Sequence, residues 1–285
     1  ADTSPCISAG ASSVTIGGTT YTAPTTDLAG NARPSPAGTM PDMGAYENNN
    51  GVASYSGDTY YVSASSDYGN GSSTYPFPAI QQGIDASSSG DTVSVAAGTY
   101  VENINFSGKN ISVIGADSSN TIIDGDSLTS VVMFKNQENS TALLKNFTIK
   151  NGFMIPGETQ AGGIYCYSAH PKLENLVVME NHGGGIALFY SDSEVINTEV
   201  KYNHSGTGFH INDNSPTLTN VYIKNNNSEG LDITHSDNTF IQGSVISENS
   251  GIGIDINFST VEMKTTNIRD NTNSGTAGGI RIKNS

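Results

Sequence analysis

Short runs of alternating apolar and polar residues recur at a nearly fixed interval through the second half of the chain. From about residue 160, the pattern small residue, Gly, apolar, any residue, apolar appears six times, and successive glycines lie 22, 23, 22, 23 and 26 residues apart. Alternation of this length is typical of a β-strand with one buried face. The six copies are GGIYC (162–166), GGIAL (184–188), TGFHI (207–211), EGLDI (229–233), GIDI (253–256) and GGIRI (278–282).

A second motif, apolar-x-x-Asn, keeps the same step, with its asparagines 22, 23, 23 and 22 residues apart, and a third short segment lies between the two motifs. Three short strands in 22–23 residues predict one coil of a parallel β-solenoid. An inward Asn at a fixed turn can bond the backbone of its own coil and of the next, and it tolerates the left-handed conformation of sharp corners. The expected ladder is Asn181, Asn203, Asn226, Asn249 and Asn271.

The first half is less regular but compatible with the same architecture. Its expected strands, broken by glycines, are 92–95, 111–114, 121–123, 131–134 and 143–149. Before them, Ile80 and Ile84 lie one helical turn apart in 78–86, which predicts a short amphipathic helix. Because an open solenoid end exposes apolar core and unpaired strand edges, we expect this helix to be a cap.

Composition agrees with a non-helical, Asn- and Gly-rich protein: 32 Gly and 30 Asn among 285 residues, with only 14% charged residues. The net charge of −15 provides no basic stripe for nucleic acid and no polybasic membrane patch. No apolar run approaches the roughly 18 residues of a membrane-spanning helix, so we expect no membrane insertion. Two cysteines, Cys6 and Cys166, are too few for a disulfide framework, and Cys166 is expected to be a core thiol.

The stretch 60–115, together with the 22-residue coils, resembles the opening of right-handed parallel β-helix proteins, the pectate-lyase-like superfold of bacterial secreted and surface proteins. The resemblance covers about 58–285 and implies an all-β, right-handed parallel β-helix with 58–90 as the N-terminal cap and 91–285 as coils. SPCISAG (4–10), TDLAGNARP (26–34) and PDMGAYE (41–47) resemble the closing segment of choice-of-anchor Q β-helix domains. Residues 1–47 are therefore expected to be the tail of a preceding unit and 48–57 a linker, within a longer protein that has several such units.

Residues between the two inward apolar positions of each Gly-apolar strand point outward and form a column along the coils. This column reads Tyr165, Ala187, His210, Asp232, Asp255 and Arg281, and the next outward column reads Tyr167, Phe189, Asn212, Thr234, Asn257 and Lys283. Asp232 and Asp255 are expected roughly 5 Å apart on adjacent strands.

This constellation has three interpretations. The two carboxylates could bind Ca²⁺ while Arg281 holds an acidic sugar, or they could form the acid and base pair of a glycosidase. In the third, which we favour, opposite charges on adjacent strands pair for stability and solubility: Arg281 with Asp255, and His210 with Asp232. The aromatic residues Tyr165, Tyr167, Phe189 and Tyr190 could likewise stack on sugar rings or stabilise the β-ladder, and we favour stabilisation of the ladder.

The sequence therefore predicts a secreted or cell-surface bacterial β-helix that serves as a non-catalytic structural or adhesive segment of a modular protein. Its expected partners are other copies or units of the same protein and cell-surface or matrix polysaccharide, and no cofactor is expected apart from calcium at Asp232 and Asp255. The alternative is a polysaccharide lyase, hydrolase or epimerase acting on uronic-acid polymers, with Asp232, Asp255, Arg281 and His210 as catalytic candidates.

Overall fold

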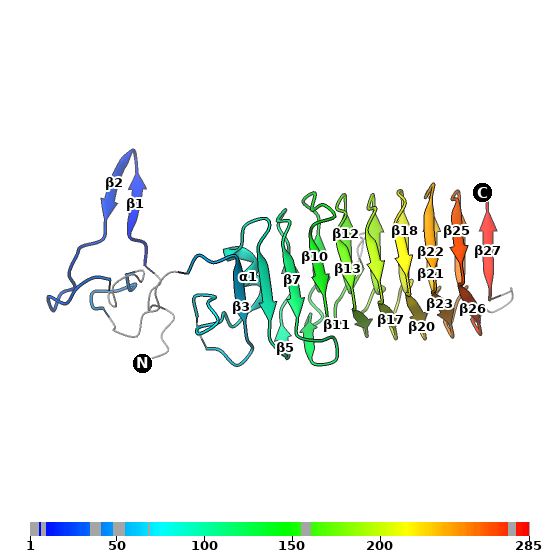
Figure 1. Cartoon of the computed structure of the whole chain (residues 1–285), viewed down its shortest axis with the longest axis horizontal. Coiled ribbons are helices and arrows are strands. Elements are labelled where there is room, and N and C mark those ends of the chain that lie inside the picture. The colour runs from blue at the N-terminus through cyan, green and yellow to red at the C-terminus, as the bar shows by residue number, and fades with distance from the viewer. Residues whose placement is uncertain are drawn as a thin grey trace.

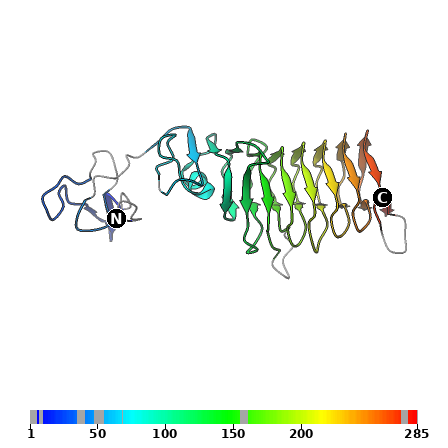
Figure 2. The ribbon, with the colours of Figure 1, turned by 90° about the horizontal axis from the view of Figure 1, so that it is seen from below.

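From residue 59 onward the chain winds into a parallel β-solenoid, in which each coil adds one short strand to each of three sheets (Figure 1). The computed structural model describes residues 6, 10–34, 41–47, 55–67, 69–154, 161–272 and 278–284. In all three sheets the neighbours of a strand are its counterparts in the adjacent coils, so the coils stack along the long axis (Figures 1 and 2). The prediction of an all-β solenoid with three strands per coil is confirmed.

We number the sheets in the order in which the chain first enters them. Sheet 1 consists of β3 (Thr59–Val62), β4 (Thr92–Val95), β7 (Ser112–Gly115), β10 (Leu143–Lys145), β13 (Lys172–Glu174), β16 (Glu194–Ile196), β19 (Thr217–Thr219), β22 (Thr239–Gln242) and β25 (Val261–Lys264). Sheet 2 consists of β5 (Gly98–Val101), β8 (Thr121–Asp124), β11 (Thr148–Lys150), β14 (Val177–Met179), β17 (Glu199–Lys201), β20 (Tyr222–Lys224), β23 (Val245–Ser247) and β26 (Asn267–Arg269). Sheet 3 consists of β6 (Ile104–Asn105), β9 (Val132–Phe134), β12 (Ile164–Tyr167), β15 (Ile186–Phe189), β18 (Phe209–Asn212), β21 (Leu231–Thr234), β24 (Ile254–Asn257) and β27 (Ile280–Lys283).

The core runs through the solenoid as one continuous cluster of the inward apolar side chains. Aliphatic residues dominate it, and the rings of Phe106 and Phe134 pack with their centroids 4.1 Å apart. Cys166 lies fully buried in this core, as predicted. Its thiol is free, and burial raises the pKa of that thiol above the usual range.

The buried asparagines form the expected ladder between sheets 2 and 3. Asn203 Nδ2 donates to Oδ1 of Asn226 at 2.9 Å and to the backbone carbonyl of Val178, one coil back, at 3.1 Å. The backbone N–H of Asn203 also donates to Oδ1 of Asn226, so each amide oxygen accepts two bonds from the preceding coil. The same Nδ2–Oδ1 bond of 2.9 Å joins each adjacent pair in the series Asn181, Asn203, Asn226, Asn249 and Asn271.

One detail of the ladder differs from the prediction. The ladder asparagines do not adopt the left-handed conformation; the residue immediately before each one does, with φ between 54° and 58° at Glu180, Tyr202, Asn225, Glu248 and Asp270. The chain turns its corner one residue early, which leaves the Asn side chain free to point into the core. A separate, outward set of corner asparagines does adopt positive φ, at Asn146, Asn175, Asn197 and Asn220 between sheets 1 and 2.

The glycine of the repeat is required by this ladder. A Cβ on Gly208 would lie 2.7 Å from Nδ2 of Asn226 and 2.9 Å from the carbonyl oxygen of Gly230. Equivalent clashes with the ladder amide and the glycine carbonyl of the next coil occur at Gly163, Gly185, Gly230 and Gly253. Since none of these glycines has positive φ, space and not backbone freedom explains them.

The first half follows the prediction with one correction, and its coils have two further strands, β5 and β6, that were not predicted. The segment 143–149, expected as one strand, is two strands, β10 and β11, because Asn146 at φ 66° turns the chain between them. The helix α1 (Ile80–Ala86) buries Ile80 and Ile84 against the first coil, as expected for a cap. The Glu102 carboxylate accepts the N–H groups of Ile80 and Gln81 at 2.7 and 2.9 Å and so caps the start of this helix.

The N-terminal segment has a separate local structure. An antiparallel hairpin of β1 (Ser13–Ile16) and β2 (Thr19–Thr22) precedes a loop organised by Asp27. The Asp27 carboxylate accepts bonds from the Asn31 side chain and from three backbone N–H groups, and these bonds lower its pKa to about 2. The division into a preceding tail, a linker and a solenoid stays a prediction. In the ranges described, no helix combines the length and apolarity needed to cross a bilayer.

We expect Gly208→Ala to lower the free energy of unfolding by about 2 kcal/mol or more, because its methyl group would displace the Asn226 amide or the next coil. Gly279→Ala is the matched control: Gly279 occupies the same place in the repeat, but among the described residues, its chain neighbours aside, no atom lies within 4 Å of its Cβ position. Urea denaturation followed by circular dichroism measures both. Equal effects of the two substitutions would contradict the steric explanation.

Candidate functional site

The outward face of sheet 3 carries the predicted site residues in the two expected columns. In the strand register, each residue of the first column pairs with the next one along the coils, from Tyr165 and Ala187 to Arg281. The second column pairs in the same way, from Tyr167 and Phe189 to Lys283. The face divides into an aromatic end at β12 and β15 and a charged end at β21, β24 and β27. We call it the sheet 3 face.

At the aromatic end, four rings and one imidazole form a continuous cluster. Phe189 lies 5.9 Å from Tyr165 and 5.1 Å from His210 between ring centroids, and Tyr167 lies 5.6 Å from Tyr190. Tyr165 is only 8% exposed because it packs with Ala161 and Ala187 in a small apolar cluster outside the main core. Tyr165 therefore stabilises the cluster, whereas Tyr167, at 43% exposed, presents its ring to solvent.

A hollow of about 440 Å³ opens beside this cluster. Its wall combines apolar surface from Phe189 and Ala187 with polar groups of His210, Asn212 and Thr207. The turn Ser205–Gly206–Thr207 and the residues Met154, Ala161, Gly183 and Ile186 complete the lining. No sequence pattern predicts this hollow, because its depth depends on how turns from three coils stand above the sheet.

At the charged end, Asp255 is held by two cations. Arg281 Nε donates to Oδ1 of Asp255 at 2.8 Å and its Nη2 donates to Oδ2, while Lys283 Nζ lies 3.7 Å from Oδ2. Asp255 is 8% exposed, and the Arg281 guanidinium holds the pKa of this carboxyl below its usual range. This bidentate pair is the Asp255–Arg281 pairing that the sequence favoured.

His210 and Asp232 form the second expected pair. Nδ1 of His210 lies 2.9 Å from Oδ2 of Asp232, and Thr234 Oγ1 donates to the other carboxylate oxygen at 3.4 Å. When Nδ1 carries the proton, Asp232 fixes the imidazole tautomer and Nε2 keeps its lone pair. His210 thus lies between the charged end and the hollow, which it also lines.

The expected calcium site stays a prediction. Asp232 and Asp255 are neighbours in register, but Arg281 bonds both oxygens of Asp255. Among residues 6, 10–34, 41–47, 55–67, 69–154, 161–272 and 278–284, no group of three or more His, Cys, Asp or Glu side chains is arranged to hold a metal ion.

Sequence reasoning missed the corner that joins sheet 3 to sheet 1. From the coil of β12 onward, one residue per coil turns this corner with φ between 48° and 54°, and two of these residues are the aromatic Tyr190 and Phe258. The left-handed conformation is strained for bulky side chains, at a cost of about 1–2 kcal/mol each. The corner residues are found by taking the residue that directly follows each sheet 3 strand from β12 onward: Ser168, Tyr190, Asp213, His235, Phe258 and Asn284.

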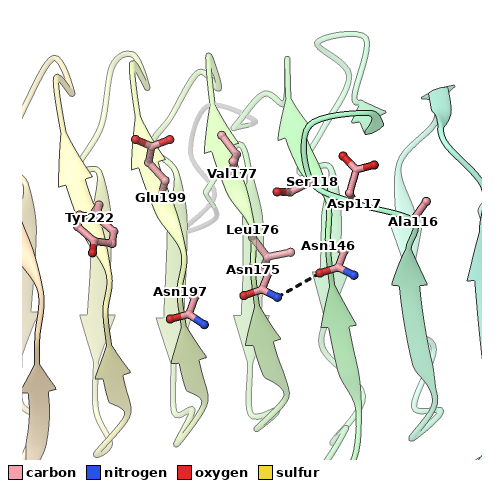
Figure 3. Close-up of a pocket in the computed structure, with 10 residues that line it drawn as sticks. All are labelled: Ala116, Asp117, Ser118, Asn146, Asn175, Leu176, Val177, Asn197, Glu199 and Tyr222. Atoms are coloured by element: carbon pink, nitrogen blue, oxygen red, sulfur yellow. Dashed lines mark hydrogen bonds between the residues drawn. The ribbon is translucent and has the colours of Figure 1, made fainter.

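A second hollow of about 440 Å³ lies at the opposite side, along the corner between sheets 1 and 2 (Figure 3). Three of the outward corner asparagines, Asn146, Asn175 and Asn197, line it, and Asn175 Nδ2 donates to Oδ1 of Asn146 at 3.2 Å. Its acidic groups are engaged within the fold: Glu199 pairs with Lys201 and Lys224, and Asp117 accepts bonds within its own turn. We therefore take the sheet 3 face as the candidate site.

The comparisons with known proteins identify the fold. Residues 162–285 match the family model described as "Right handed beta helix region". The fold is a right-handed parallel β-helix. This confirms the fold that the sequence resemblance implied. A search of curated proteins returned no match.

One similar solved structure, a pectate lyase, supports the same fold. The pectate lyase Pel9A is similar with a TM-score of 0.57 and 16% identity, over 75% of this chain and 63% of that enzyme, so the chain spans less than two thirds of its length. A carrot pectin methylesterase gives 0.48 and 12%, over 82% and 91% of the two chains. The Azotobacter vinelandii mannuronan C-5 epimerase AlgE6 A-module gives 0.35 and 17%, over 71% and 74%. At 16% identity, the likeness to the pectate lyase concerns the fold alone.

We expect Asp255→Asn to lower the free energy of unfolding by about 2 kcal/mol at pH 7, because the variant loses a charge-assisted, bidentate pair. Since the folded pKa of Asp255 lies below the unfolded value, the pair stabilises the fold above about pH 4, and this stabilisation is lost as the pH falls through the folded pKa. The difference between variant and wild type should therefore shrink in acid.

Denaturant titrations at a series of pH values measure this difference. Asp270→Asn is the control: Asp270 pairs with Arg269 at 2.7 Å, but its side chain is 63% exposed, so the expected change is below about 1 kcal/mol. A pH-independent effect of Asp255→Asn would contradict the ion-pair account.

Proposed function

We propose that the sheet 3 face is a polysaccharide-binding surface and that the solenoid acts as a rigid, glycan-contacting rod. The observation that supports this most directly is the hollow beside Phe189 and His210, where an aromatic wall meets hydroxyl and amide groups. Sugar rings have an apolar face that packs on aromatic side chains and hydroxyl groups that require hydrogen-bond partners. The fold shared with a pectate lyase supports the same ligand class.

The charges of the face favour a hydroxyl-rich polymer with few charges. The chain has a net charge of −15, which repels a polyanion at long range. The cations of the sheet 3 face, Arg281 and Lys283, are both engaged by Asp255. A neutral polysaccharide therefore fits this surface better than a uronic-acid polymer does.

This proposal develops the expected structural or adhesive role. The coils extend along one axis (Figure 2), so the same face can be presented at a distance along a rod. A secreted or cell-surface location and association with other units of the same protein belong to the proposal as well.

We expect Phe189→Ala to weaken polysaccharide binding about tenfold or more, because it removes the aromatic wall of the hollow. Phe240→Ala is the matched control, since Phe240 is an equally half-buried phenylalanine on the outward face of sheet 1. Affinity electrophoresis in gels that contain glucan, mannan, xylan or polygalacturonate compares the variants. The proposal fails if no polysaccharide retards the wild type, or if both variants behave alike.

A second candidate, catalysis on a bound uronic-acid polymer, is favoured by the His210–Asp232 pair. With Asp232 on Nδ1, His210 Nε2 can accept the C5 proton of a uronate residue. The C–H electron pair forms the C4–C5 double bond as the C4–O4 bond breaks, and the departing oxygen takes up a proton. This is the chemistry of a polysaccharide lyase.

If the face is catalytic, His210→Asn should abolish the formation of unsaturated sugar product from polygalacturonate or alginate, with and without Ca²⁺. His170→Asn is the control, because His170 also lies near an aspartate, Asp192, but on a turn outside the site. We expect the wild type to bind polysaccharide without turnover. Turnover that depends on His210 would establish the second candidate instead.

A further inference from the structure

The corner between sheets 3 and 1 carries two pairs of aromatic rings along the edge of the sheet 3 face. Tyr167 and Tyr190 lie 5.6 Å apart between centroids in an edge-to-face arrangement, and we call them the first platform. His235 and Phe258 lie 5.3 Å apart with only 2° between their ring planes, and we call them the second platform.

Both platforms are open to solvent. Tyr167, Tyr190 and Phe258 are 43%, 46% and 51% exposed, and His235 is exposed as well. Tyr190 and Phe258 hold their rings outward at φ 52° and 49°, where the other corner positions carry Ser, Asp, His or Asn. Two bulky aromatic residues thus occupy strained positions without contributing their rings to the core, which favours a role at the surface.

The platforms are aligned with the solenoid axis. Tyr167 and Tyr190 come from the coils of β12 and β15, and His235 and Phe258 come from those of β21 and β24. The coil of β18 separates them, so the platform centres are about 14 Å apart at the usual strand spacing. In that gap lie Asn212 and Asp213, whose half-buried amide and carboxylate face the same edge.

We infer that His235 and Phe258 form a second sugar-stacking site, and that the polysaccharide runs parallel to the solenoid axis from the first platform to the second. Asn212 and Asp213 would meet the hydroxyl groups of the sugars between the two platforms. A disaccharide is too short to reach both platforms, whereas a hexasaccharide can, so the ligand is an extended polymer and not its end group or a free sugar. The inference rests on the proposed polysaccharide-binding function.

Once an oligosaccharide is bound at the first platform, its contact with the second platform is effectively intramolecular. Affinity should therefore rise with the length of the oligosaccharide. We expect the hexasaccharide of the bound polymer class to bind at least about tenfold more tightly than its disaccharide. The probes are cello-, manno- and xylo-oligosaccharides of two and six sugars, measured by isothermal titration calorimetry on the full chain.

The decisive variant is Phe258→Asn, because Asn occupies the equivalent corner at position 284 with φ 51° and removes the ring without new backbone strain. It should abolish most of the hexasaccharide advantage and leave disaccharide affinity unchanged. Tyr202→Asn is the matched control: Tyr202 is 45% exposed at φ 54°, but on the corner between sheets 2 and 3, where Asn225 occupies the next coil at φ 55°. His235→Ala provides an independent second variant.

The outcomes separate this inference from the proposed function. A length advantage that Phe258→Asn and His235→Ala both remove, and that Tyr202→Asn preserves, supports the second site. Equal affinity for the disaccharide and the hexasaccharide would overturn the second site, as would a hexasaccharide advantage that survives Phe258→Asn. In either case, binding that still depends on Phe189 would leave the proposed function standing. Absence of binding by every probe and by the parent polysaccharides overturns both.

Discussion

The buried asparagine ladder is the interaction on which the rest of this structure depends. Each ladder amide bonds its counterpart in the next coil and a backbone carbonyl of the preceding coil, so it leaves little freedom in how one coil sits on another. An unpaired amide in this core would cost about 1–3 kcal/mol, so a shift of register at one coil is penalised at the coils on both sides. The repeat glycines exist because the ladder amide occupies the space of their Cβ atoms.

Because the register between coils is fixed, residues that recur once per coil form columns along the solenoid axis on the surface. On the sheet 3 face these columns place Phe189 beside His210, His210 beside Asp232, and Asp255 beside Arg281. The charged neighbours pair with one another, whereas exposed rings at the aromatic end and along the corner have solvent on one side. The two ends of this face therefore differ: the side chains of the charged end pair within the protein, whereas the aromatic end exposes rings to solvent, and the proposed function assigns ligand binding to these rings.

Much of the fold could be predicted from the sequence, because each coil places the same kinds of residue at the same turns and strands. The intervals of the Gly and Asn motifs were sufficient to predict the solenoid, its three strands per coil, the ladder and the order of both outward columns. The turn at Asn146 was missed because the less regular first half lacks a repeat with which to compare it. The burial of Tyr165 was missed because it depends on Ala161, which precedes the strand and packs outside the main core. The hollows and the aromatic corner depend on side-chain direction at positive φ, which strand alternation does not describe.

The most direct test of the account is a crystal structure of the chain with a bound hexasaccharide of the polymer class that it retains in affinity gels. The account predicts density for a sugar chain along the solenoid axis, over Phe189 and Tyr190 and onward to Phe258, with the Asn ladder and the Asp255–Arg281 pair unchanged. A sugar chain bound across the coils, or in the asparagine-lined hollow between sheets 1 and 2, would contradict it.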